Sequence, residues 1–427
     1  MTEKYKEVLE KMAKYNPWGG SVQATGYERR EYLVKITPYM GTRLVKVLVG
    51  QRRSGKSYLM RQVIRFLNQQ KKVDPRNIFY LNKEYTAFDE IRTHSDLEAL
   101  FLCYRKEMQV NGKIFLFLDE VQDISSWEFF VNSYSQDFTE DYELVVSGSN
   151  SRLLSGEMAT LLSGRYVEME IFPFSYFEFA EVKEMLPGKE SYLEYLKTGG
   201  LPEMLQLEGE EMRRGYLTGL KNTVILRDIV ERHTIRDLPQ LEEIFKFLMS
   251  NIGSLTSVSN IVSYFKSRQK KSNYETVSAY IRYLTDAFLF HQADRYHLKG
   301  KQLLGGSSKY YLNDLAFKNI LLGVLPTDLG HHLENLVYLQ LKSRGYDVRV
   351  GILNNMEIDF VAQKSGIVLY FQVCYQLNSD QIFRREFGNL FQINDNHPKY
   401  VISLDDVKFT NYEGIVHLRP WELGDLF

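Results

Sequence analysis

The sequence predicts an α/β protein that begins with a parallel sheet covered by helices. Short, continuously apolar runs recur between residues 44 and 171, and such runs are typical of strands that are buried on both faces. Amphipathic segments of helical length, such as residues 58–68 and 95–106, separate the runs, as the crossover connections of a parallel sheet require. The chain of 427 residues has room for several domains of roughly 100–200 residues each, and its later part shows three further patterns.

The composition excludes several classes of protein. Lys and Arg number 53 and Asp and Glu number 54, so any grip on nucleic acid must come from a local basic patch. The 2 cysteines, Cys103 and Cys374, are too few for a disulfide framework or a Cys-rich zinc site and fit a reducing compartment. Because the sequence has no apolar run of membrane-spanning length and no secretory signal pattern, we expect a cytoplasmic protein without a membrane span.

A phosphate-binding motif lies between the first apolar run and the helix that follows it. Residues 50–57 match the pattern GxxxxGK[ST] in the strand-turn-helix context that this motif requires. The motif residues are Gly50, Gln51, Arg52, Arg53, Ser54, Gly55, Lys56 and Ser57. Glycines let the backbone N–H groups of such a loop face one anion. We therefore expect Lys56 to neutralise the β- and γ-phosphates of a nucleotide and the Ser57 hydroxyl to bind Mg²⁺.

A second motif supports this interpretation. The apolar run at residues 114–118 ends in Asp119 and Glu120. A carboxylate at a strand end can hold Mg²⁺ through water, which we assign to Asp119, and the neighbouring Glu120 can act as the general base for an attacking water. An acidic pair at a strand end is often only a solvated loop start. Together with the phosphate-binding loop, however, the pair favours ATP hydrolysis over the chemistry of a nucleotide kinase or a GTPase.

With three further motifs, the chain resembles a known family, the AAA+-like prokaryotic ATPases that carry a C-terminal domain of unknown function. The five motifs in order are residues 50–57, 118–122 (LDEVQ), 147–151 (SGSNS), 162–165 (LSGR) and 199–203 (GGLPE). The resemblance covers most of the chain. It implies a polar sensor of the γ-phosphate at Ser149 or Asn150, although this segment also fits a simple turn. It further implies that Arg165 is either an arginine finger or part of a structural salt bridge.

Two helical segments follow the expected ATPase domain at residues 1–171. Residues 172–237 have helical spacing with glycine breaks, which indicates a helical lid or an inert spacer. The pattern of residues 238–325 predicts three helices followed by a basic hairpin, which is the order of elements in a winged helix. The cations that we assign to a DNA-binding surface are Lys266, Arg268, Lys270, Lys271 and Arg282. Such a cluster can bind DNA phosphates, but a solvated loop or a protein contact fits the same pattern.

The last segment, residues 326–427, predicts a second α/β unit that resembles the restriction-endonuclease-like fold. In that fold a helix glutamate, a strand-end aspartate and a Glu-x-Lys pair bind metal and activate water. Glu334 and Asp359 match, whereas Gln372 and Cys374 stand where the glutamate and the lysine of the pair would be. We expect a non-catalytic relic that lacks its cation, because the site has lost a carboxylate ligand and its lysine. Glu357 shares a strand face with Asp359 and is the residue that could replace the lost carboxylate.

The fold class that we expect is therefore α/β: an AAA+-like parallel-sheet ATPase domain, a helical lid, a winged helix and a degenerate nuclease-like α/β domain. The function that follows is Mg²⁺-dependent ATP hydrolysis driving a conformational switch, with duplex DNA, a second copy of the chain or another protein as partner. Two alternatives come from other classes. One is a nucleotide-gated interaction scaffold with little hydrolysis, and the other is a DNA-cleaving effector.

Overall fold

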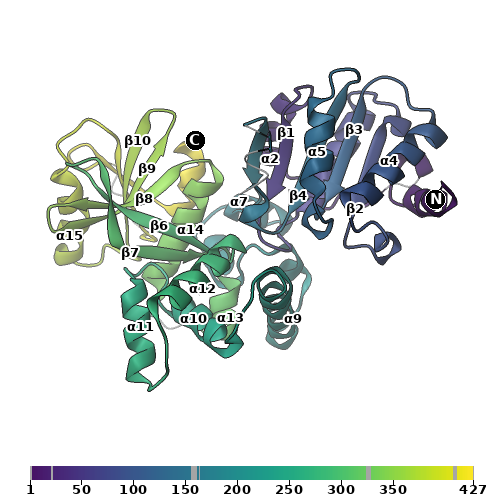
Figure 1. Ribbon diagram of the computed structural model, residues 1–427. Helices are drawn as coiled ribbons and strands as arrows, with labels where there is room; N and C mark the ends of the chain where they lie inside the picture. The colour runs from purple at the N-terminus through teal and green to yellow at the C-terminus, as the bar shows by residue number, and fades with distance from the viewer. Residues whose placement is uncertain are drawn as a thin grey trace. The chain divides into compact units, whose positions relative to one another are not determined.

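The computed structural model describes residues 2–20, 23–154, 161–162, 164–323, 328–406 and 411–426. The chain divides into two compact units, Met1–Ile171 and Phe172–Phe427 (Figure 1). Within the described residues, no helix is both long and apolar enough to cross a membrane.

The first unit contains a sheet of five parallel strands in the order β2-β3-β4-β1-β5. The strands are β1 (Val45–Val49), β2 (Ile78–Asn82), β3 (Ile114–Asp119), β4 (Tyr142–Gly148) and β5 (Tyr166–Glu170). Every residue of β1 to β4 is buried, whereas the edge strand β5 is partly exposed. The expected parallel sheet is thus confirmed, and its continuously apolar strands follow from burial on both faces.

Helices cover the sheet of the first unit (Figure 1). They are α1 (Thr2–Ala13), α2 (Arg30–Ile36), α3 (Lys56–Gln69), α4 (His94–Met108) and α5 (Trp127–Gln136). Short 3-10 turns join these elements at Pro17–Gly19, Thr37–Tyr39, Pro75–Asn77, Thr86–Phe88, Val121–Asp123 and Ser151–Leu154. The buried face of α3, with Leu59, Val63 and Leu67, belongs to one apolar cluster with Tyr80 of β2 and Phe117 of β3. This packing fixes the start of α3 at the carboxyl edge of the sheet.

The second unit begins with helices. They are α7 (Tyr176–Val182), α8 (Lys189–Thr198), α9 (Glu210–Thr223), α10 (Leu238–Ser250), α11 (Val258–Ser267) and α12 (Tyr274–Asp286). A 3-10 turn at Pro202–Gln206 lies between α8 and α9. Within the helical segment expected at residues 172–237, residues 223–230 also have helical spacing. In the structure, Val224–Val230 forms a π-helix, η8, that continues α9 without a break.

The remaining elements of the second unit build a mixed sheet of seven strands in the order β12-β11-β10-β9-β8-β6-β7. The strands are β6 (Phe290–His297), β7 (Gln302–Leu312), β8 (Asp347–Leu353), β9 (Met356–Lys364), β10 (Ile367–Val373), β11 (Lys399–Ile402) and β12 (Ile415–Leu418). The accompanying helical segments are α13 (Ala316–Leu321), α14 (Leu329–Ser343), α15 (Asp380–Phe391) and the 3-10 segment η10 (Pro420–Leu426). The last two strands and α15 were not among the elements expected from the sequence.

The hairpin expected in the winged-helix segment is present, but it belongs to this larger sheet. Strand β6 pairs antiparallel with β7 and parallel with β8. The border that we expected between residues 325 and 326 therefore does not separate two sheets. Three helices, α10 to α12, and a hairpin do occur in the expected order, and the parallel pairing ties them to the last hundred residues.

Helix α14 packs on the hairpin through polar and aromatic contacts. The Asn335 side chain donates to the Leu312 carbonyl and accepts from the Leu312 N–H, each at 2.8 Å. The rings of Tyr311 and Tyr338 stack with their centroids 4.2 Å apart. These contacts place one face of α14 against β7, where a charged cluster described below is formed.

The same helix buries a histidine that has no polar partner. His332 is fully buried, and neither ring nitrogen has a hydrogen-bond partner among the described residues. Burial, with a smaller effect of the Lys318 charge, lowers the pKa of His332 to about 4. The unfolded chain takes up this proton near pH 6.5. The neutral, buried His332 therefore contributes to the stability of the fold above pH 6.5, and this contribution is lost as the pH falls toward 4.

We predict that His332→Leu reduces the acid sensitivity of the fold. Between pH 7 and pH 5 the wild type should lose about 2 kcal/mol of unfolding free energy through this group, and the variant should not lose it. Urea unfolding of both proteins at the two pH values measures the difference. Replacing the exposed His397 by Gln is the control for the loss of a histidine at the surface. An equal loss in the wild type and in His332→Leu would contradict the prediction.

Candidate nucleotide-binding site

The loop between β1 and α3 needs glycine at two positions. Gly50 has φ of 144°, and a Cβ atom there would lie 2.3 Å from the Ile171 carbonyl oxygen. Gly55 has φ of 100° and is the N-cap residue of α3. Both conformations are unfavourable for residues with side chains. The loop thus curls tightly in front of the first turn of α3, whose free N–H groups form an anion-binding end.

The loop contains a buried polar atom that fits an anionic ligand. The Ser54 hydroxyl is buried and has no hydrogen-bond partner among the described residues. The backbone N–H of Ser54 donates to the Gln51 carbonyl at 3.1 Å, which closes the turn. Burying a hydroxyl without a partner is costly. A phosphate oxygen at this place would remove that cost, so the loop residues fit a nucleotide phosphate.

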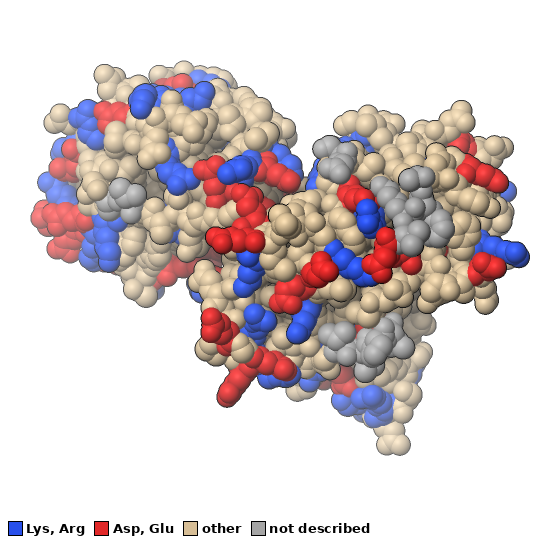
Figure 2. Space-filling view, turned by 180° about the vertical axis from the view of Figure 1, so that it is seen from behind, with Lys and Arg blue, Asp and Glu red and all other residues tan. Residues whose placement is uncertain are grey.

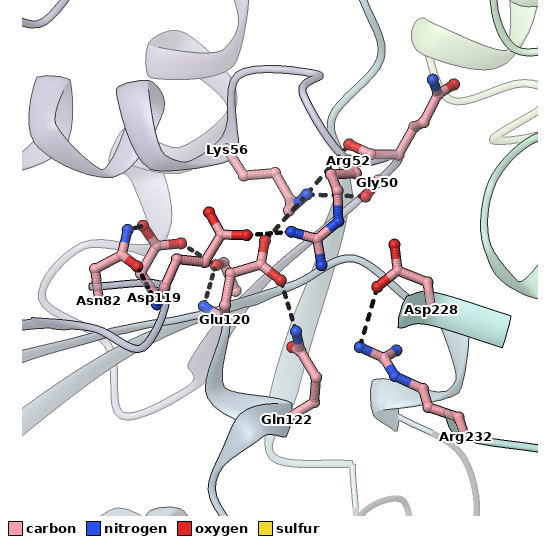
Figure 3. Close-up of polar contacts among 12 residues, drawn as sticks. Gly50, Arg52, Lys56, Asn82, Asp119, Glu120, Gln122, Asp228 and Arg232 are labelled. Carbon is pink, nitrogen blue, oxygen red and sulfur yellow. Dashed lines mark hydrogen bonds and ion pairs between the residues drawn. The ribbon is translucent and has the colours of Figure 1, made fainter. Parts of the chain in front are cut away.

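Lys56 is the first residue of α3 and is buried. Its Nζ donates to the carbonyl oxygens of Gly50 at 3.0 Å and Gln51 at 3.2 Å. The same atom lies 3.5 Å from Oε1 of Glu120 (Figure 3). The lysine charge is therefore held by two carbonyls of its own loop and by the carboxylate that the sequence assigned as general base.

Asp119 ends β3 and is fully buried. Its carboxylate accepts hydrogen bonds from Ser147 on β4, from Tyr80 at 3.0 Å and from Asn82 at 2.8 Å, the latter two on β2. The Ser57 hydroxyl also bonds to it. Burial, followed by the negative charge of Glu120, raises the pKa of Asp119. Ser57 and Asp119 thus lie together, and a divalent cation beside them would offset the cost of burying the Asp119 charge.

Glu120 follows β3 in the left-handed conformation, with φ of 54°. Its backbone N–H donates to the Ser147 hydroxyl at 3.1 Å, and its Oε2 accepts from the side-chain amide of Gln122 at 2.6 Å. Gly148 leaves room for this amide, because a Cβ atom at Gly148 would lie 2.5 Å from Oε1 of Gln122. A left-handed non-glycine residue is strained and is often found at functional sites. The turn aims the Glu120 carboxylate back at Lys56.

Sequence reasoning missed four side chains of this arrangement: Tyr80, Asn82, Gln122 and Ser147. Their signal was present, since Asn82 and Ser147 end or follow apolar runs as Asp119 does, and the carboxyl ends of parallel strands meet at one edge of the sheet. Gln122 and Ser147 were noted only as parts of motifs, without a role of their own.

The other expected residues of the first unit lie as follows. Arg52 is buried and forms an ion pair with Glu84, while Arg53 is exposed. Ser149 and Asn150 are buried and directly follow β4. The Nε atom of Arg165 donates to the Leu162 carbonyl at 3.2 Å, just before β5. Arg165 therefore makes a local backbone contact, and its role as an arginine finger stays a prediction.

The cations assigned to DNA are exposed on and after α11 and on α12. Arg268 lies 3.7 Å from Glu243 of α10, and Lys270 also pairs with Glu243. Arg268 and Arg282 further lie over the rings of Tyr264 and Tyr283. On the face shown in Figure 2, basic and acidic side chains are interspersed over the described residues. The Glu243 carboxylate thus partly neutralises the basic loop, which comprises residues 266–271.

The nuclease-like cluster contains a cation that the sequence did not indicate. Glu334 of α14, Glu357 and Asp359 of β9 all face the ammonium of Lys309, which lies on β7. Our expectation that this site lacks its cation was therefore wrong. The lysine comes from the hairpin, some fifty residues before Asp359, and the shared sheet brings it there.

Gln372 and Cys374 have structural contacts. The Gln372 side chain accepts from the Asp359 N–H at 2.7 Å and donates to Glu386 at 3.1 Å. Cys374 is buried in an apolar cluster with Phe387 and Val401. Burial raises the pKa of the Cys374 thiol, so it is held protonated. Both residues thus support the strand β10 rather than add a charge to the cluster.

Two family models match parts of this chain. A family model described as an AAA domain matches residues 42–180, which include the loop, β3 and β4. A second model, described as a domain of unknown function (DUF8612), matches residues 189–328.

The chain also has relatives that match most of its length. An uncharacterized protein of Haemophilus influenzae is 35% identical over 92% of this chain and 98% of its own length. The uncharacterized protein MJ1544 of Methanocaldococcus jannaschii is 30% identical over 82% of this chain and 78% of its own length.

Among solved structures, the Aeropyrum pernix ORC1 protein in complex with DNA aligns with a TM-score of 0.34 and 14% identity. That alignment covers 69% of this chain and 92% of the other. The Aeropyrum pernix ORC2 protein aligns with a TM-score of 0.38 and 14% identity over 74% of this chain and 93% of the other. Similarities at this level do not bear on function. The family-model matches and the two relatives do identify the chain, which belongs to the AAA+-like ATPase family with an AAA domain followed by a C-terminal domain of unknown function.

Proposed function

We propose that the protein hydrolyses ATP and uses the nucleotide as a conformational switch. The observation that carries the proposal is the meeting of Lys56, Ser57, Asp119 and Glu120 at one edge of the first sheet. An anion-binding loop, a hydroxyl-carboxylate pair for Mg²⁺ and a carboxylate for water are the three parts that ATP hydrolysis needs.

The reaction that we propose is in-line attack of water on the γ-phosphate of ATP. Bound Mg²⁺ would supply positive charge between the phosphates, held by Ser57 and Asp119. The loop N–H groups and Lys56 bind the phosphates, and Glu120 orients the water and takes its proton. Ser149 or Asn150, next to β4, would sense the γ-phosphate.

The contacts of Lys56 support a switch. Lys56 Nζ donates to two loop carbonyls and approaches Glu120. A phosphate that binds Lys56 must compete with these contacts. When Lys56 turns to the phosphate, Glu120 loses its cation and becomes available for water. In this proposal the helices of residues 172–237 respond as a lid, and the π-helix η8 supports that role because π-helices are rare and often occur at functional sites.

A nucleotide-gated scaffold is the second candidate. The observation that favours it is the Gln122 amide, which donates to Glu120 at 2.6 Å. If this bond persists when ATP is bound, Glu120 is held away from water and hydrolysis is slow. Phosphate release by the wild type and by Glu120→Gln under saturating ATP separates the candidates. Turnover that Glu120→Gln abolishes supports the ATPase, and equal, negligible turnover supports the scaffold.

We predict that Lys56→Ala and Glu120→Gln have opposite effects on bound ATP. Lys56→Ala removes the cation that faces the phosphates and should weaken ATP binding at least tenfold, which is about 1.4 kcal/mol. Glu120→Gln keeps the loop and should retain ATP at the wild-type affinity or tighter while it stops hydrolysis. Equilibrium titration with a fluorescent ATP analogue measures both. Lys71→Ala, at an exposed lysine beyond α3, is the control, and an equal fall in affinity for Lys56→Ala and Glu120→Gln would refute the assigned roles.

We also propose that the basic loop after α11 binds duplex DNA. The four exposed cations Lys266, Arg268, Lys270 and Lys271 lie within six residues of one another. Lys270 and Arg268 share Glu243, so a phosphate would compete with one carboxylate for two cations. A loop that contacts only other proteins is the alternative.

We predict that changing the four cations together to Gln lowers DNA affinity and flattens its salt dependence, because each phosphate that the protein neutralises adds about 0.9 to the steepness of log K against log salt. Glu243→Gln should have the opposite effect and raise the affinity for DNA, because it removes the carboxylate that pairs with Arg268 and Lys270. Fluorescence anisotropy with a labelled duplex from about 50 mM salt upward measures both. If the wild type does not bind DNA, or if the slope of log K against log salt is unchanged in the fourfold variant, the loop contacts other proteins and not DNA.

A further inference from the structure

The charged cluster of the second unit is centred on a lysine. Nζ of Lys309 lies 2.8 Å from Oε1 of Glu334, 2.7 Å from Oε1 of Glu357 and 3.6 Å from Oδ1 of Asp359. The side chain of Lys309 is 4% exposed. Three carboxylates from two elements, α14 and β9, thus converge on one ammonium that a third element, β7, provides.

The remaining contacts of the carboxylates hold this arrangement. Oε1 of Glu334 also accepts from the Tyr311 hydroxyl at 2.6 Å, and Oδ2 of Asp359 accepts from the Val373 N–H at 2.8 Å. Burial alone would lower the pKa of Lys309, but the charges of Glu334, Asp359 and Glu357 outweigh it and raise the pKa. The ammonium therefore stays charged and compensates these carboxylates, while Nδ1 of His331 lies 3.7 Å from Oε2 of Glu334 on the other side.

The fold that this segment resembles would place a divalent metal among these carboxylates. The side chains present do not fit one. Among the described residues, no group of three or more His, Cys, Asp or Glu side chains could hold a metal ion. The cluster is nevertheless accessible, because Lys309, Glu334, Glu357 and Asp359 line a cavity of about 750 Å³. A metal ion could therefore reach the carboxylates. The site does not fit one because the ammonium of Lys309 already lies among them.

We propose that the ammonium of Lys309 takes the place of the divalent cation, so that this site is a built-in, metal-independent ion cluster. The cluster joins β7 of the hairpin to α14 and β9, and its role is to hold the hairpin in the sheet of the second unit. One univalent cation balances the three carboxylates less completely than a divalent metal would. Removing the lysine leaves the buried Glu334 and the largely buried Asp359 without this cation, which is strongly destabilising, and makes room for a metal.

The test is the Asp359-dependent binding of Mn²⁺, measured by electron paramagnetic resonance as the difference between each protein and its Asp359→Asn variant. Taking this difference separates the cluster from any Mn²⁺ bound by Ser57 and Asp119. The wild type should show no Asp359-dependent binding at about 1 mM Mn²⁺. Lys309→Met should show it, with a Kd of roughly 10⁻⁵ to 10⁻³ M, the range of modest carboxylate sites. Its thermal midpoint should be lowered without metal and should rise when Mn²⁺ is added.

Lys318→Met is the matched control. Lys318 is another buried lysine of the second unit, and it lies 3.4 Å from the carboxylate of Asp328. Its loss should destabilise the protein without creating a metal site. A gain of Mn²⁺ binding in Lys309→Met but not in Lys318→Met therefore separates replacement of a metal from simple loss of a buried charge.

Two results would overturn the proposal. One is Asp359-dependent Mn²⁺ binding by the wild type, together with metal-dependent nicking of plasmid DNA that Asp359→Ala abolishes. This outcome would make the site a metal-dependent nuclease in which Lys309 assists. The other is a folded Lys309→Met protein that binds no Mn²⁺ at the cluster. If Lys309→Met does not fold without metal, recovery of folded protein on adding Mn²⁺ supports the proposal, and failure with and without metal leaves the wild-type measurement to decide it.

Discussion

The carboxyl ends of parallel strands meet at one edge of a sheet, and the candidate nucleotide site depends on this constraint. It brings β2, β3 and β4 together so that Tyr80, Asn82 and Ser147 can hydrogen-bond to Asp119. A carboxylate buried at the end of an apolar strand would be costly without such partners. Burial still raises the pKa of Asp119, so the edge is preorganised for a cation. The same geometry places Glu120 opposite the phosphate-binding loop.

The loop itself is maintained by close approach. Gly50 faces the carbonyl of Ile171 at a distance that admits no side chain, and Gly55 caps α3 in a left-handed conformation. These two positions set the direction in which Lys56 leaves the helix. Its ammonium is then satisfied by weakly competing groups, two backbone carbonyls and one carboxylate at 3.5 Å. Such contacts keep Lys56 ordered in the absence of phosphate and can be exchanged for phosphate oxygens.

Sequence patterns predicted the parts of the molecule that are encoded locally. The loop at residues 50–57, the apolar strands of the first unit and the carboxylates after β3 are each visible within a short stretch. The neighbours of Asp119 carried the same strand-end signal, but single polar residues are not distinctive without a sheet order. Lys309 had no local signal, because its partners come from α14 and β9. Its position follows from the parallel pairing of β6 with β8, which no motif indicates. The pairing of Arg268 and Lys270 with Glu243 likewise depends on how α10 packs beside the loop.

Two buried lysines illustrate how one chemical group serves different ends. Lys56 directly contacts one carboxylate, at 3.5 Å, and two backbone carbonyls, so its contacts carry no excess negative charge and an incoming anion can replace them. Lys309 has three carboxylates around it, so its charge is overcompensated and an incoming anion is repelled. The ratio of carboxylates to ammonium therefore decides which lysine can bind phosphate. Of these two buried lysines, Lys56 is therefore the one that can bind a phosphate, and the cluster around Lys309 acts on the stability of the second unit.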